Sequence, residues 1–150
     1  TSFVEPQDLA FAQTDQFTPP PETSAKRRRR YPNQWHLTAS TTGKFERALF
    51  FTVLRPHRAA EEGTLPALRR IVSQGLVGVT WQQASEAHTV LYGEKGASWE
   101  GLETDGRVAA VRRSKGKVTA WLVHGATRLA VDGRAVLTSA TRATRTSSSE

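Results

Sequence analysis

The chain has 150 residues, a formal net charge of +7, and neither Cys nor Met. The absence of cysteine excludes disulfides and thiolate metal sites. The sequence contains no apolar run of about 18 residues, so no transmembrane helix is predicted. It also does not begin with the pattern of a signal peptide. The length suits one domain, or one domain with a piece of a neighbour. Because the sequence begins at Thr1 and lacks Met, we expect a processed product or an excised fragment.

Acidic and basic residues are arranged in blocks. Residues 1–25 hold four acids and no Lys or Arg, and residues 26–58 hold nine bases against one acid. Residues 82–105 are acidic again, and residues 107–150 carry nine bases against two acids. This distribution indicates a polyanionic partner (nucleic acid, anionic polysaccharide or membrane surface) or, with equal weight, a solvated surface rich in Arg.

The first predicted strand covers residues 9–17, where Leu9 and Phe11 alternate with small or polar side chains. The three prolines at residues 19–21 end it. A polar loop at residues 23–32 follows and contains the run Lys26-Arg-Arg-Arg-Arg30. Five adjacent like charges resist burial, so this loop is either a mobile surface segment or a patch for polyanions.

Two further strands are predicted at residues 34–40 and 48–54. The first alternates apolar and polar side chains, as a strand with one buried face does. The second is nearly all apolar, which is typical of a strand covered on both faces. We expect the two to pair around a turn and to form the hydrophobic centre of the chain.

Short strands separated by turn signals are predicted after residue 65. The Asp132-Gly133 dipeptide is the strongest hairpin signal, because a two-residue type I′ turn needs positive φ at both positions. The Ser- and Thr-rich residues 139–150 are predicted to be a flexible tail. The expected strands are a short one leading on from 65–72, then 76–81, 88–92, 107–113, 118–124, 128–131 and 134–138, with a short pairing within 98–102.

These elements predict an all-β fold, an antiparallel β-sandwich or pair of packed sheets with short hairpins. Residues 1–58 are expected to be the end of a β-sandwich carrying the basic loop 23–32. Residues 59–138 are expected to form a small C-terminal antiparallel β domain, followed by the flexible tail.

No catalytic constellation or metal motif stands out. The four histidines are not spaced as a pair on one strand, and no HExxH or carboxylate cluster with ligand spacing occurs. Trp35 and Trp121 are expected in the core, whereas Trp99, in a Gly-rich segment, is the tryptophan most expected at the surface. Binding side chains are often displayed where a strand ends, and guanidinium groups match carboxylate and sulfate geometry. The candidate binding residues are Arg55, His57, Arg58, His36 and Trp99.

Several segments resemble the C-terminal portion of heparinase II/III-like polysaccharide lyases. They are residues 13–17 (Gln-Thr-Asp-Gln-Phe), 19–22 (Pro-Pro-Pro-Glu), 31–39 (Tyr-Pro-Asn-Gln-Trp-His-Leu-Thr-Ala) and 51–58 (Phe-Thr-Val-Leu-Arg-Pro-His-Arg). The resemblance implies β-elimination at an acidic sugar by the whole enzyme, with catalytic residues in parts absent from this chain. It therefore implies no catalytic residue and no cofactor here, and leaves open a metal in the missing part.

Three hypotheses follow. The first is a non-catalytic β domain of an acidic-polysaccharide lyase, which packs against preceding domains and contacts substrate. This hypothesis implies a periplasmic or secreted protein and disfavours nucleic acid and membrane as partners. The second is a stand-alone basic module for polyanions, either glycosaminoglycan or nucleic acid. The third is an adhesion or scaffolding sandwich without a small ligand.

Overall fold

The structure is a computed structural model that describes residues 2–15, 36–73 and 75–148. The predicted all-β class is confirmed, because the described residues form twelve strands and a single short 3₁₀ helix, η1 (Ala59–Thr64). The chain divides into two units, a larger one of residues 1–4 and 52–150 and a smaller one of residues 5–51. The predicted basic loop and Trp35 lie outside the described residues. In the part of the chain described, no helix is long and apolar enough to cross a membrane.

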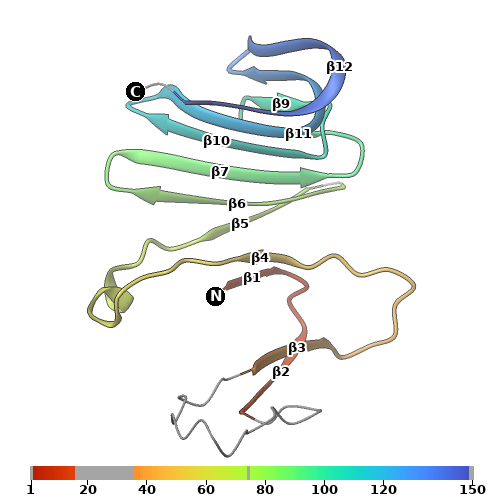
Figure 1. The fold of residues 1–150 in the computed structure, drawn as a ribbon, viewed down its shortest axis with the longest axis vertical. Helices are drawn as coiled ribbons and strands as arrows, with labels where there is room; N and C mark the ends of the chain where they lie inside the picture. The colour runs from red at the N-terminus through yellow and green to blue at the C-terminus, as the bar shows by residue number, and fades with distance from the viewer. Residues whose placement is uncertain (1, 16–35, 74, 149–150) are drawn as a thin grey trace, which may run out of the picture. The chain divides into compact units, whose positions relative to one another are not determined.

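One antiparallel sheet makes up most of the larger unit (Figure 1). Its strands are hydrogen-bonded in the order β5-β6-β7-β10-β11-β9-β8, and β12 pairs with β11. The strands are β5 (Arg69–Ser73), β6 (Leu76–Gln83), β7 (Glu86–Gly93), β8 (Ala97–Trp99), β9 (Leu102–Thr104), β10 (Val108–Ser114), β11 (Lys117–Val131) and β12 (Arg134–Ser148).

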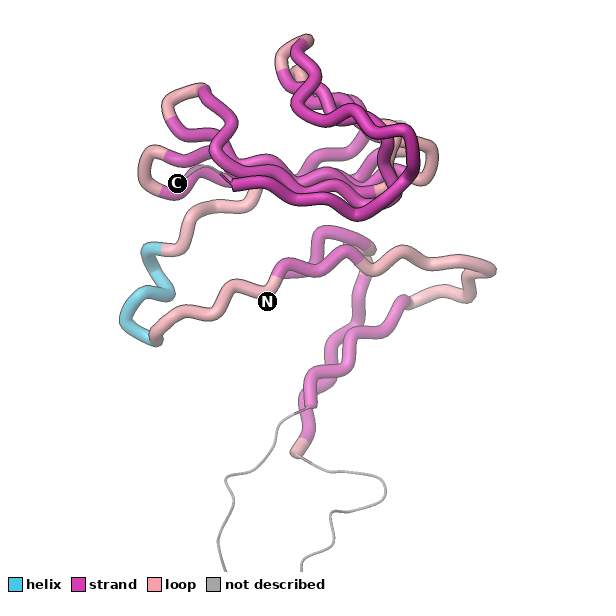
Figure 2. Tube along the Cα trace, turned by 45° about the horizontal axis from the view of Figure 1, so that its top comes forward, coloured by secondary structure: helices cyan, strands magenta, loops and turns pink. Residues whose placement is uncertain are grey.

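The strand β11 belongs to two layers of this sheet. Its first half pairs with β10, and its last residues, 129–131, pair with β9. Between the two halves the ladder with β12 is irregular from Val123 to Arg128, and Gly125 has a φ of 66°. The ladder and Gly125 therefore place the bend of β11 here, and Figure 2 shows that the sheet curls over itself.

The core lies on the inner faces of the curled sheet. It joins residues of β7 and β10 to residues of β9 and the second half of β11. Trp121 and Trp99 are partly buried and pack against it, so Trp121 lies at the core as predicted. The fully buried members with the largest side chains are Leu91, Leu102, Leu129 and Val123.

The hairpin prediction at Asp132-Gly133 is confirmed, with φ values of 51° and 76°. Two other predictions near it are wrong. The stretches 118–124 and 128–131 are one strand, because Gly125 bends β11 without ending it. The expected tail from residue 139 instead continues β12 as far as Ser148, and Ala143 and residues 145–148 pair with β11.

The smaller unit contains a two-stranded ladder of β2 (Leu9–Thr14) and β3 (His36–Thr41). Its register places Phe11 opposite Ala39, so strands are present where 9–17 and 34–40 predicted them, as far as the structure describes those residues. The predicted alternation of buried and exposed side chains is wrong for both strands, because their burial does not follow it. The predicted pairing of 34–40 with 48–54 is wrong, because β4 (Phe51–Val53) pairs with β1 (Ser2–Glu5).

The hydrophobic centre is also not where the sequence placed it. Phe11, Leu37 and Phe50 are at least half exposed, and Leu54 is 72% exposed. An apolar pattern predicts a strand and which side chains share a face. It does not show whether another layer of the protein covers that face. The buried cluster comes instead from residues 71–131.

Candidate functional site

A depression of about 330 Å³ lies on a face of the curled sheet in the larger unit, across β6, β7, β10, β11 and β12. Residues paired directly across antiparallel strands share a face. Two such rows cross the depression, and both lie on the face opposite the core residues Leu91, Ala109 and Val123. The residues of these rows that line the depression are Val90–Ala110–Leu122–Thr146 and Trp81–His88–Arg112–Ala120.

Differences in side-chain size explain why this face has a depression. Ala110 and Ala120 are small and stand beside larger neighbours on the same rows. On one side, the rings of Trp81 and His88 are stacked with centroids 4.7 Å apart and an interplanar angle of 4°. A volume of this size is at the lower end of the roughly 300–1,000 Å³ of small-molecule sites.

Arg112 and His88 line the same side of the depression, and the carboxylate of Glu86 lies close to both. The Glu86 carboxylate places Oε1 3.7 Å from Nε of Arg112 and Oε2 3.6 Å from Nε2 of His88. Arg112 Nε also donates a hydrogen bond of 3.2 Å to the Thr119 hydroxyl. The arrangement combines an apolar floor, an aromatic wall and a guanidinium, which are the elements that hold an anionic, partly apolar ligand.

The sequence offers no strong signal for this site. The polar residues 82–87 lie outside the predicted strands 76–81 and 88–92, whereas the chain turns at Ala84 and Ser85 and pairs Gln83 with Glu86. Ala84-Ser85 is not one of the Asn-Gly, Asp-Gly or Gly-containing pairs typical of a two-residue turn. A two-residue hairpin fixes the register of both strands. With that turn recognised, Trp81 falls opposite His88, and the aromatic pair becomes predictable.

The predicted residues at the end of β4 form a folded turn. A terminal nitrogen of Arg55 donates to the Pro66 carbonyl, and Nδ1 of His57 lies 2.9 Å from the Arg55 carbonyl oxygen. The Arg58 amide donates a hydrogen bond of 3.2 Å to the Glu61 carboxylate, and the Glu61 amide donates one of 2.9 Å to the Arg58 carbonyl. Arg55 therefore closes a loop, while the side chains of His57 and Arg58 are exposed.

The other two predicted residues lie elsewhere. His36 begins β3 of the smaller unit and is paired with Thr14. Trp99 belongs to β8 and is partly buried against the core, so the expectation that it is exposed is wrong. The Arg69 guanidinium lies 5.3 Å from its ring centroid and also bonds Glu100 at 3.2 Å. The ligand roles predicted for these two residues, and for the three at the end of β4, stay predictions.

A second polar cluster lies where β11 bends. Asp105 accepts hydrogen bonds from the amides of Thr127 and Arg128 and from the Thr127 hydroxyl, at 2.7–2.9 Å. Arg142 contacts its carboxylate at 3.4 Å and donates to the carbonyls of Asp105 and Gly125. Burial acts to raise the pKa of Asp105, but these hydrogen bonds and Arg142 outweigh it and lower that pKa. Every donor is internal to the fold, so this cluster stabilises the bend.

Among residues 2–15, 36–73 and 75–148, no group of three or more His, Asp or Glu side chains is arranged to hold a metal ion. Comparison of the chain with models of known protein families and with curated proteins gives no match.

Proposed function

We propose that this chain is a non-catalytic β domain that binds an acidic polysaccharide and is accessory to a β-eliminating lyase of the heparinase II/III-like type. The resemblance at residues 13–17, 19–22, 31–39 and 51–58 and the all-β fold are consistent with the proposal. The observation that carries it is the depression, with its Trp81–His88 wall and the adjacent Arg112. A sugar ring offers apolar C–H faces to the lining, and its carboxylate or sulfate suits the guanidinium.

The depression supports this function better than diffuse binding of any polyanion. Among the described residues of the larger unit, several arginines lie within 4 Å of a carboxylate, which neutralises much of their field. They include Arg69, Arg112, Arg113, Arg128 and Arg142. Of these, only Arg112 lines the depression.

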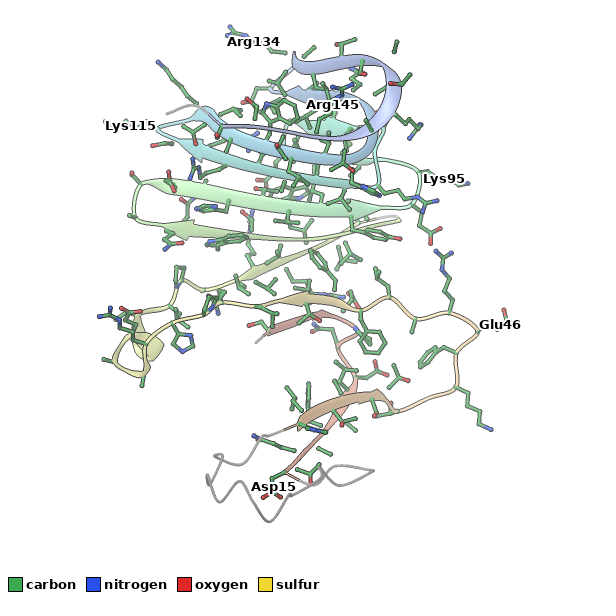
Figure 3. All side chains as sticks on the ribbon, viewed as in Figure 1. Asp15, Glu46, Lys95, Lys115, Arg134 and Arg145 are labelled. Atoms are coloured by element: carbon green, nitrogen blue, oxygen red, sulfur yellow. The ribbon has the colours of Figure 1, made fainter. Side chains whose placement is uncertain are left out.

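Calorimetric titration of the full chain with an oligogalacturonate tests the proposal. We expect Arg112→Gln to weaken binding by roughly tenfold to a hundredfold, as loss of a hydrogen bond to a charged group does. Trp81→Ala should weaken it as well, because the aromatic wall is removed. Arg134→Gln is the matched control, since it removes the same charge from the exposed β11–β12 turn (Figure 3).

The opposite results are equally clear. Equal losses in Arg112→Gln and Arg134→Gln, with single-stranded DNA binding as well as the oligosaccharide, would establish a general polyanion module instead. No binding of the acidic oligosaccharide by the unaltered chain would overturn the proposal.

A further inference from the structure

The Glu86 carboxylate lies between His88 and Arg112, two residues that line the depression. Its distances of 3.7 Å to Arg112 and 3.6 Å to His88 are both longer than a hydrogen bond. Its side chain is 35% exposed. The carboxylate therefore lies beside both partners without being fixed by a hydrogen bond to either.

The two partners are held more firmly than Glu86. Arg112 is anchored through Nε to Thr119, whose hydroxyl also bonds the Arg112 carbonyl at 3.3 Å. The His88 ring is fixed by its stack on Trp81. Nε2 of His88 is buried and has no hydrogen-bond partner among the described residues. A small movement of Glu86 would supply that partner.

We propose that Glu86 is the internal occupant of an anion subsite at Arg112, and that a ligand carboxylate replaces it there. This inference rests on the proposed function. The displaced Glu86 carboxylate moves to Nε2 of His88, and the imidazole takes up one proton from solvent. No covalent bond to carbon changes, and the subsite selects uronic acid residues over neutral sugars.

Charge balance explains the proton. Two carboxylates beside one guanidinium repel each other, and a charged imidazole offsets the added negative charge. The charged groups on this face near His88 are Glu86 from β7, Arg112 from β10 and Lys117 from β11, one row further on. The neighbouring strand β6 contributes Trp81 and the uncharged Gln83. Because the exchange takes up a proton, binding should strengthen as the pH falls.

Calorimetry of the full chain with oligogalacturonate, in buffers of different ionisation enthalpy at one pH, measures the proton directly. We expect net proton uptake on binding, and affinity at least roughly threefold higher at pH 5.5 than at pH 7.5. The methyl-esterified oligosaccharide should bind weakly and without proton uptake, because it brings no carboxylate to Arg112.

Two variants separate the steps. Glu86→Gln should bind roughly twofold to fivefold more tightly, since it no longer competes for Arg112, and should take up no proton. His88→Gln should bind without proton uptake, and circular dichroism checks its fold. Should that variant unfold, the buffer comparison and Glu86→Gln remain decisive.

Failure of the inference is distinct from failure of the proposed function. Tight binding with no proton uptake, or Glu86→Gln binding with unchanged affinity and unchanged proton uptake, would overturn the exchange and leave polysaccharide binding intact. If the chain bound no oligogalacturonate at any pH, both the exchange and the proposed polysaccharide binding would be overturned.

Discussion

At the scale of single residues, Asp105 illustrates how one carboxylate holds a bend in the backbone. It receives two amides and a hydroxyl from Thr127 and Arg128, all within 3 Å. These donors favour the ionised carboxylate, which is why the pKa of Asp105 is lowered although burial opposes the shift. The folded state therefore binds this proton less readily than the unfolded chain does.

We predict that Asp105→Asn lowers the free energy of unfolding at pH 7 by about 1–2 kcal/mol, because hydrogen bonds to a charged acceptor are lost. The stabilisation is complete above the ordinary Asp pKa of 3.8 and is lost as the pH falls through the lower folded value. Urea unfolding of both proteins at pH 7 and near pH 3 measures this effect. The difference between them should shrink at the acid end.

Glu103→Gln is a suitable control for that measurement. Glu103 lies 3.8 Å from Arg128, and both side chains are more than half exposed. Exposed pairs of this kind contribute about 0.5 kcal/mol or less. A loss at Glu103 as large as that at Asp105 would contradict the role assigned to the bend.

At the scale of elements, the bend in β11 is tightly packed from the side of the β9–β10 connection. A Cβ added to Gly106 would lie 2.7 Å from Cβ of Ala126 and 2.8 Å from the His124 carbonyl oxygen. Gly106 also donates its amide to the Thr104 hydroxyl at 3.0 Å. A methyl group at this position would push β11 away from the turn that holds it.

Gly106→Ala is therefore expected to cost about 1–3 kcal/mol, the usual penalty for overpacking. Chemical denaturation monitored by tryptophan fluorescence measures it. Gly63→Ala provides the comparison, since a Cβ at Gly63 meets nothing within 4 Å and its φ is ordinary. That variant should be neutral or slightly more stable, and an equal loss at both sites would refute the steric explanation.

At the scale of the whole molecule, the two units differ in how much they bury. The larger unit contains a continuous core, whereas none of the described residues of the smaller unit is buried. A two-stranded ladder is marginally stable by itself in water. The two units should therefore open with different free energies.

Amide hydrogen exchange followed by mass spectrometry tests this difference. We expect amides of β7, β10 and β11 to exchange only through global unfolding, and those of β2 and β3 to exchange through local opening. Protection of β2 and β3 equal to that of β10 would show that the smaller unit shares the stability of the larger one.

The sequence predicted the positions of strands and one tight turn better than it predicted how strands pair and which layer covers them. Alternating side chains and the turn at Asp132-Gly133 identified most strands, because those signals are local. The apolar run ending at Leu54 was taken for the core, yet Leu54 is exposed, since burial depends on what covers a strand. The stacking of Trp81 on His88 could not be predicted for a similar reason, because it depends on the register of the hairpin that pairs them.

The bend at Gly125 also bears on how quickly the protein folds. Each hairpin of the larger unit joins strands that are near in sequence, and such pairs form within about 1–10 μs. The core between the two layers can form only after β11 has bent, because the bend places the second half of β11 and its partner β9 over the layer of β7 and β10. We therefore expect the bend to belong to the folding nucleus, so that weakening it slows refolding more than it accelerates unfolding.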